Sequence, residues 1–374
     1  MKCIHCATDA THKERANGKC PKCSHKFAFD PRDGDKLTDG AMQRAIEVAG
    51  SQGQVKFLPE HAFLVWCRLH PLGFWLRPWP LFGPWSGVVI GAGVVVIGLF
   101  SNEWWLAGIS AAATLWAANR VLEIKADLPQ LTTTQAMDEA TFGALLSRFE
   151  KTHGKPANLL RPRGHHPSAD GHVKTPAIAA EAAHYSFDRA VICDRADIVD
   201  VLISNDFHFE NNCALLTADG HPSRVFKTVR AMLRNNPKLV VVVLHDSSPD
   251  GCRLPEILRN HPDWFAKTAQ VIDVGLRPDH APSFSNQTQR LSFAQPVAAG
   301  DGLSRGEAVW LTKYRLSLAA IIPEQLVKRL HAAFVQAEAA PAPDPATAGD
   351  NSIVQSDVIS VSTSGSDGGA DSFG

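Results

Sequence analysis

The chain has 374 residues, which is room for about two domains with accessory segments. Lys and Arg together number 37 and Asp and Glu 38, so there is no overall basic excess of the kind that marks a nucleic-acid-binding protein by composition. Of eight cysteines, four stand in paired spacing at the N-terminus and the others are scattered, mostly in apolar runs. This pattern is typical of a reducing compartment and one metal site, and it argues against a disulfide framework.

The N-terminal residues 1–31 carry two Cys-x-x-Cys pairs, Cys3 with Cys6 and Cys20 with Cys23, separated by 13 residues. Two such pairs hold Zn²⁺ tetrahedrally through four thiolates, and a closed Cys₄ shell is structural because it leaves no position for a substrate. A segment this short would take its folding energy from the metal. The pattern predicts a zinc ribbon. The alternative, a redox pair, is disfavoured because neither pair precedes a βαβ unit.

Residues 32–78 are predicted to be a short helical linker region. Thr38 or Asp39 is a suitable N-cap for a helix that Gly50 ends. A second apolar helix is expected at Phe57–Arg68.

Residues 79–122 predict a helical hairpin in a membrane. Pro78–Asn102 is uncharged over 25 residues, more than the roughly 20 that a helix needs to cross a bilayer. A second uncharged run, Trp104–Asn119, has 16 residues and is extended by the apolar residues after it. Seven of the nine tryptophans lie in or beside this stretch, as at membrane interfaces. The alternative is a buried pair of helices in a soluble core.

The charges around this stretch predict its orientation. Arg68 and Arg77 precede it and Arg120 and Lys125 follow or end it, while the turn carries only Glu103. By the positive-inside rule both termini are cytoplasmic. The expected location is a bacterial inner (cytoplasmic) membrane, so the membrane is one expected partner.

Residues 123–185 are predicted to be a helical and loop connector. Thr132–Thr134 is expected to cap a helix through Phe142 and Phe149 that closes near Gly154. Three histidines in the Pro- and Gly-rich loop that follows are more typical of a solvated segment than of a metal site: His165, His166 and His172.

From residue 186 to 337 the pattern indicates an α/β domain with a helical end. Three short apolar strands are expected at Ala190–Cys193, Cys213–Thr217 and Leu239–Leu244. Helices between them are expected at Ala196–Asn205 and Val225–Leu233. Continuous apolar strands alternating with helices favour a parallel sheet covered on both faces. In such a sheet the functional edge is where the strands end.

The residues after these strands carry a resemblance to a known family. They are Asp194, then Gly220-His221-Pro222, then the run from Asp246 to Gly251, and later Gly275-Leu276-Arg277-Pro278-Asp279. In this order they resemble the Toprim domain of the topoisomerase VI A subunit and its meiotic relatives. The resemblance implies a Rossmann-like fold.

The resemblance also implies site residues. Asp194, Asp246 and Asp250 are the candidate catalytic carboxylates around Mg²⁺, which prefers oxygen ligands. Four positions of the matching turns are candidate cofactor-binding residues: Gly220, Pro222, Ser248 and Gly251. Asp194 stands where the family has Glu, and Ser248 stands where it has a second Asp, which thins the charge around a metal.

Several other residues are expected to have no catalytic role. Strand cleavage by topoisomerases needs a tyrosine nucleophile on a winged helix. Tyr185 and Tyr314 are the only tyrosines, and neither lies in such a segment. His208 and His245 are interpreted as structural, and Asp273 as the cap of a strand end. Ser247 and Ser248 lack the elbow motif of a nucleophilic serine.

The predicted fold class is therefore multidomain: a small β zinc ribbon, an α-helical transmembrane hairpin, an α/β Toprim-like domain and a disordered C-terminal tail. The tail, residues 338–374, is rich in Ala, Pro, Asp, Ser and Gly and cannot bury enough surface to fold.

The leading functional hypothesis is a membrane-anchored binding or scaffold module that recognises a nucleic-acid end, a nucleotide or a protein partner. The competing hypothesis is a Mg²⁺-dependent nuclease or phosphoryl-transfer enzyme that uses Asp194, Asp246 and Asp250. A third is a membrane sensor whose zinc head recruits a partner.

Overall fold

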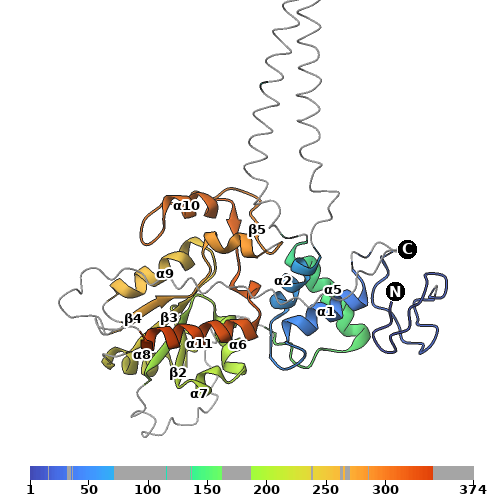
Figure 1. Cartoon of the computed structure of the whole chain (residues 1–374), viewed down its shortest axis with the longest axis horizontal. Helices are drawn as coiled ribbons and strands as arrows, with labels where there is room; N and C mark the ends of the chain where they lie inside the picture. Colours follow the sequence, from blue (N-terminus) through green and yellow to red (C-terminus); the bar gives the residue numbers. More distant parts are fainter. Residues whose placement is uncertain are drawn as a thin grey trace, which may run out of the picture.

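The computed structural model describes residues 1–15, 17–31, 35, 37–70, 115, 135, 137–161, 187–236, 239–261, 264–265, 270–284 and 286–339. Within these ranges an N-terminal segment and three helices lie beside a parallel α/β body (Figure 1).

Three helices make up the part between the N-terminal segment and the sheet. They are α1 (Asp39–Ala49), α2 (Pro59–Leu69) and α5 (Glu139–His153). The side chain of Thr38 caps α1 by accepting from the backbone of Ala41, and Gly50 ends the helix, as predicted. The predicted start of α5 is wrong: its N-cap is Asp138, several residues after the Thr132–Thr134 cluster, and Gly154 ends it.

The sheet has four parallel strands in the order β2-β1-β3-β4. The strands are β1 (Arg189–Cys193), β2 (Cys213–Thr217), β3 (Val240–Leu244) and β4 (Gln270–Asp273). The first three agree with the predicted apolar runs to within a residue. β4 is not among the three predicted strands, because it is short and only half of it is buried, although Asp273 at its end was interpreted as the cap of a strand end.

Alternate residues of each strand face opposite sides, so the sheet divides the core into two layers. Val191, Leu215 and Val242 belong to one cluster of buried side chains, while Ile192, Leu216 and Val243 belong to another. The first face is covered by α6 (Ala196–Ser204), α7 (Phe207–Glu210) and α11 (Pro323–Ala339). The second is covered by α8 (Phe226–Asn235) and α9 (Pro249–Asn260). The body is thus a three-layer α/β/α arrangement.

The three N-terminal helices share the core of the first face. One cluster of buried apolar side chains includes Phe29, Met42, Phe63 and Phe142 together with residues of β1, β3 and α11. Hydrogen bonds also join the two parts, for example from the side chain of Gln287 to the backbone carbonyl of Leu64. The helices around residues 39–69 and 139–153 therefore pack on the α/β body and do not form a separate core.

The C-terminal part of the body returns to the edge where the strands end. Its elements are η4 (Pro278–Ser283), β5 (Gln289–Arg290), α10 (Arg305–Leu311), β6 (Tyr314–Arg315), η5 (Leu318–Ala320) and α11. β5 and β6 form an antiparallel pair, and β6 leads into a two-sided backbone bridge between Ser247 and Leu316. The helical end predicted for this region is therefore interrupted by extended backbone.

The predicted transmembrane hairpin is corrected. No helix in the described part of the chain is both long enough and apolar enough to cross a membrane. Apart from Leu115, residues 79–122 lie outside the described residues, as do the loop with His165, His166 and His172 and the tail beyond Ala339. The supported fold class is the parallel α/β arrangement with its packed helices.

A first prediction concerns Gly275, which follows β4. A Cβ atom at this position would overlap the ring of His245, a side chain with no exposed surface. We expect Gly275→Ala to lower the free energy of unfolding by about 1–3 kcal/mol, since overpacking a buried ring forces the backbone to shift. Chemical denaturation of the full-length chain measures this.

The matched control is Gly143→Ala. Gly143 lies inside α5 with no atom near an added Cβ, so alanine should stabilise this helix by about 0.5–1 kcal/mol. If both variants unfolded like the unmodified chain, the close packing of His245 on the β4 turn would be refuted.

Candidate functional site

The four N-terminal cysteines lie together. Their sulfur atoms are all within 4.8 Å of one another, close enough to hold a metal ion such as zinc. The Sγ atoms of Cys3 and Cys23 are 3.6 Å apart, and those of Cys6 and Cys20 are also 3.6 Å apart. All eight cysteines are free, so these contacts are not disulfides.

The two pairs are held by equivalent backbone turns. Cys3 donates its N–H to Thr8, and Cys20 donates to His25, in each case closing a loop around one Cys-x-x-Cys pair. Ala7 and Ser24, the residues directly after the pairs, have φ of 55° and 60°. Such left-handed residues turn the chain so that both sulfurs of a pair face the same point. The hydroxyl and the N–H of Thr8 lower the pKa of the Cys6 thiol to about 6. The backbone of His25 acts in the same direction on Cys23, but burial and the neighbouring cysteines outweigh it and raise the pKa of Cys23 to about 12.

The N-terminal segment that contains the four cysteines is joined to the helices through Asp39. This carboxylate, fully buried, accepts hydrogen bonds from the backbone N–H groups of Ala28 and Phe29 and contacts Nε2 of His153 at 2.7 Å. The end of the predicted ribbon is thereby fixed to both α1 and α5.

A second site lies at the carboxyl edge of the sheet. In the order β2-β1-β3-β4 the chain leaves β1 toward α6 on one face and leaves β3 toward α9 on the other. Ligands of open α/β sheets bind at such a switch point, where the two loops diverge. Asp194 directly follows β1 and Asp246 follows β3 by one residue, so the structure brings these two predicted residues together.

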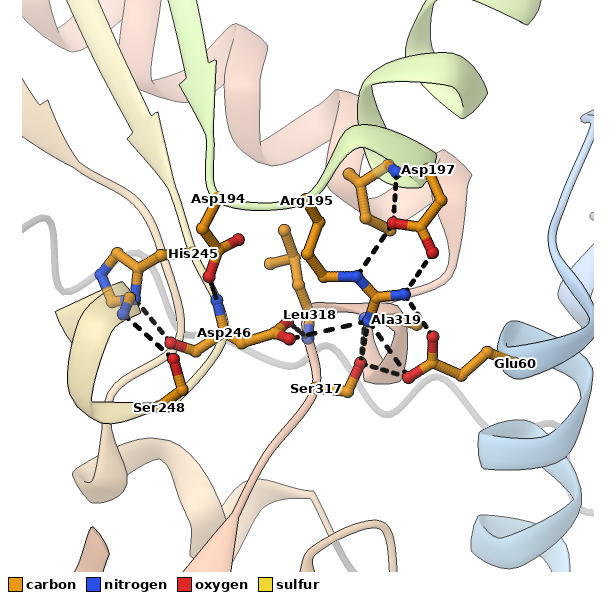
Figure 2. A network of polar contacts seen from close by, with 12 residues as sticks. Glu60, Asp194, Arg195, Asp197, His245, Asp246, Ser248, Ser317, Leu318 and Ala319 are labelled. Carbon is orange, nitrogen blue, oxygen red and sulfur yellow. Dashed lines mark hydrogen bonds and ion pairs between the residues drawn. The ribbon is translucent and has the colours of Figure 1, made fainter. Parts of the chain in front are cut away.

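Asp194 and Asp246 are held by backbone groups (Figure 2). An oxygen of Asp194 accepts the N–H of Asp246 at 2.8 Å, and Oδ1 of Asp246 accepts the N–H of Leu318 at 2.5 Å. Burial raises the pKa of Asp194. Burial and then the nearby charge of Asp194 raise the pKa of Asp246 to about 7. The pair thus retains a proton more readily than exposed carboxyls do.

Arg195 connects this edge to the N-terminal helices (Figure 2). Its guanidinium makes paired contacts with the carboxylates of Asp197 and Glu60 and also donates to Oγ of Ser317 at 2.6 Å. Asp246 is 3.7 Å away. Burial alone would lower the pKa of Arg195, but the hydrogen bonds with Asp197 and Glu60 outweigh the effect of burial, so the pKa is raised. Arg195 therefore holds α2, α6 and η5 at the site.

A buried chain of charged side chains lies beside the pair formed by Asp194 and Asp246. Nδ1 of His245 is 2.8 Å from the backbone oxygen of Asp246, and Nε2 is 3.0 Å from Oδ1 of Asp273. Both partners only accept, so both ring nitrogens donate and the imidazole is charged. Burial would lower the pKa of His245, but the hydrogen bond with Asp273 raises it well above its ordinary value. Asp273 is bound in turn by Arg277, and Arg277 by Glu307.

Two of the predicted cofactor-binding residues have a packing role. Ser248 caps α9 and accepts the N–H of Gly251 at 3.0 Å. A Cβ atom on Gly251 would lie 2.5 Å from the backbone oxygen of Asp246 and 2.8 Å from an oxygen of Asp194. Glycine is therefore required where the first turn of α9 approaches the two carboxylates.

The other predicted residues lie apart from this cluster. Asp250 is exposed in the first turn of α9. Gly220, with φ of 104°, and Pro222 form a turn after β2, where His221 contacts Asp200. His208 lies on α7, just before β2 begins and so at the opposite edge of the sheet. In the described part of the chain, the four cysteines are the only group of three or more ligand side chains close enough to hold a metal ion, so the three aspartates do not form such a group.

A cleft of about 730 Å³ opens beside the carboxylate pair. The helical part contributes the acidic residues Glu60, Asp138 and Glu139 to its lining. The β5–β6 pair contributes Arg290 and Arg315. Asp246 and Arg195 line the cleft, whereas Asp194 is not among its lining residues.

Comparisons with protein-family models, with curated proteins and with solved structures give no match for this chain. The resemblance to the Toprim domain therefore stays a prediction.

Sequence reasoning missed Glu60, Arg195 and Ser317. Arg195 directly follows Asp194 and could have been noted for that reason, but nothing local marks Glu60, which lies 135 residues before it in the chain.

A second prediction concerns Asp246 and pH. Because the folded-state pKa of about 7 lies above the ordinary value, this carboxyl favours the folded state below about pH 4, and its contribution is lost as the pH rises through 7. Asparagine cannot ionise, and it can still accept from Leu318. We expect Asp246→Asn to raise the free energy of unfolding by about 1–3 kcal/mol at pH 8 and to change it little at pH 4.5. Denaturant titrations of the full-length chain at both pH values measure this.

Asp301→Asn, an exposed loop position, is the control and should show no such pH-dependent gain. Equal destabilisation of Asp246→Asn at both pH values would contradict the raised pKa.

Proposed function

We propose that the α/β body is a binding module whose ligand occupies the cleft beside Asp194 and Asp246, and that it has no metal-dependent catalytic activity. The main support for this proposal is that both carboxylates already accept hydrogen bonds from the protein itself. Asp194 accepts from the backbone of Asp246, and Asp246 accepts from Leu318 while facing Arg195. Carboxylates that hold loops in this way have less freedom to gather around a metal ion.

The composition of the cleft supports a binding role. Its walls combine arginines, carboxylates, serines and glutamines with few apolar side chains, among them Phe63 and Met137. Because the walls come from the helical part and from the α/β body, a ligand in the cleft would contact both. Such a ligand would stabilise the arrangement that Arg195 and Glu60 already hold.

We further propose that the four cysteines bind zinc and that the zinc is structural. A Zn–S distance of about 2.3 Å in a tetrahedral shell implies sulfur–sulfur separations of about 3.8 Å, near the 3.6 Å of the two closest pairs. The hydrogen bonds of Asp39 with Ala28 and Phe29 fix this segment to the helices, as expected of a structural element.

The alternative is a Mg²⁺-dependent nuclease or phosphoryl-transfer enzyme that uses Asp194, Asp246 and Asp250. It is favoured by one observation: Asp246 lines the cleft with its pKa raised to about 7, and strongly shifted groups in clefts are often functional.

A third prediction separates these two functions. The full-length chain is incubated with single- and double-stranded DNA and RNA in Mg²⁺ or Mn²⁺, beside Asp246→Ala. We expect no cleavage above the level of that variant, because the carboxylates are engaged by the protein. Metal-dependent cleavage that disappears in Asp246→Ala but persists in Asp301→Asn would overturn the binding proposal in favour of the enzyme.

A fourth prediction concerns the metal. Purified protein should contain about one zinc per chain, because four thiolates complete one tetrahedral shell. Cys20→Ser should lose most of it, whereas Cys213→Ala, in β2, should retain it. Elemental analysis measures the zinc, and cobalt substitution reports tetrahedral thiolate coordination. Equal zinc content in both variants would show that the cysteine group is not the zinc site.

A further inference from the structure

The two Cys-x-x-Cys pairs lie on two equivalent hairpins, the first hairpin (residues 1–10) and the second hairpin (residues 18–27). In each, two backbone hydrogen bonds enclose one antiparallel bridge between two residues. Residues bridged in this way lie directly opposite each other, with their side chains on the same face and close together. The charges of the bridged residues therefore act on each other directly.

The bridged residues differ in charge between the two hairpins. In the first they are Lys2 and Asp9, a cation opposite an anion, and Asp9 also binds the N-terminal ammonium at 2.7 Å. In the second they are Lys19 and Lys26, two cations. Like charges directly opposite each other are destabilising. The second hairpin thus has repulsion at the position where the first has attraction.

The second hairpin has no acid of its own to offset this repulsion. It contains three lysines, the third being Lys22 between its two cysteines, and no Asp or Glu. All three lysines are exposed, and none forms an ion pair with another described residue. The described carboxylates of residues 1–39 already have other partners: Asp9, Glu14, Asp30, Asp35 and Asp39.

The bridged lysines face outward from a fixed support. Cys20 directly follows Lys19 and is buried with its sulfur among the other cysteines, and neighbouring side chains of extended backbone point to opposite sides. The hairpin is held by the ring of His25, which stacks on His5 of the first hairpin with 3.7 Å between ring centroids. Asp39 binds the backbone directly after the hairpin. The cations are thus presented to solvent without needing to be ordered first.

The composition of the hairpin indicates which polyanion fits it. Arg, Asn and Gln, which read base edges through paired hydrogen bonds, are absent from it. Its exposed ring, His25, is already stacked, whereas sites for single strands use rings on which bases can stack. None of the exposed large apolar side chains in the described residues belongs to it, whereas segments that lie on membranes insert such side chains. These features favour the sugar–phosphate backbone of a duplex.

We propose that the second hairpin binds the phosphate backbone of double-stranded nucleic acid without sequence preference. The bridged pair Lys19 and Lys26 supplies two of the cations, and Lys22 adds a third in the turn of the same hairpin. A duplex carries one negative charge per about 1.7 Å of its axis, so it supplies the anions that the hairpin lacks. This surface is separate from the cleft, and its role does not depend on the ligand proposed there.

The test measures binding of a labelled DNA duplex of random sequence to the full-length chain by fluorescence anisotropy, at several salt concentrations. We expect the logarithm of the affinity to fall with the logarithm of the salt concentration with a slope of about 2.7 or more, since each of three lysines contributes about 0.9. Lys19→Gln and Lys22→Gln should each reduce the slope by about 0.9. Lys26→Asp repeats the cation–anion bridge of the first hairpin. It should weaken binding about tenfold or more at low salt and retain its zinc.

The matched control is Lys313→Gln, an exposed lysine between α10 and β6. It should bind like the unmodified chain, because α10 and the N-terminal segment lie well apart (Figure 1). If Lys26→Asp lost its zinc, the two glutamine variants, which leave the bridge free of a reversed charge, would decide.

Absence of binding at about 100 µM protein in low salt, or equal binding and equal slopes for the hairpin variants and the control, would overturn the duplex site. The variants are also tested for sedimentation with vesicles that contain phosphatidylserine. Vesicle binding that depends on the three lysines, with DNA binding that does not, would assign the hairpin to an anionic membrane and overturn the proposal as well.

Discussion

The arrangement of the molecule depends on the guanidinium of Arg195. All five of its N–H groups are used, on Asp197 of α6, on Glu60 of α2 and on Ser317 before η5. These partners come from three separate parts of the chain, and all of them are largely buried. Removing Arg195 would leave these carboxylates buried without their cation, at a cost of about 3–5 kcal/mol. The same residue sets the position of the cleft, because the helical wall with Glu60 and the α/β wall with Asp246 meet at it.

The charges around Arg195 do not balance when all the acids are ionised. Glu60, Asp197, Asp194 and Asp246 surround one cation, Arg195, because the charge of His245 is already paired with Asp273. The excess of negative charge is relieved by a proton on the aspartate pair: burial raises the pKa of both carboxyls, and the charge of Asp194 raises that of Asp246 further. A protein that keeps such a pair at its switch point gives up stability there, as functional sites commonly do.

The sequence was sufficient for the parts of the fold that depend on local patterns. Continuous apolar runs located β1, β2 and β3, and their order placed Asp194 and Asp246 at one edge. The spacing of the paired cysteines is also a local pattern, and it predicted the metal-binding cluster near the N-terminus. The contact of Arg195 with Glu60 could not be predicted, because it joins positions 135 residues apart and depends on how α2 packs. The backbone bridge between Ser247 and Leu316 likewise joins distant parts of the chain, and no motif signals it.

At the switch point the protein's own groups are bound to the carboxylates, and we propose that no metal ion competes with them. The most direct test is a carbon-13 NMR titration of the aspartate carboxyls in the full-length chain, with and without Mg²⁺, using Asp246→Asn to assign the signal. We expect one carboxyl that titrates near pH 7 with a midpoint unchanged by millimolar Mg²⁺. A midpoint that Mg²⁺ lowers by a unit or more, about 1.4 kcal/mol of metal binding to the ionised form, would contradict it.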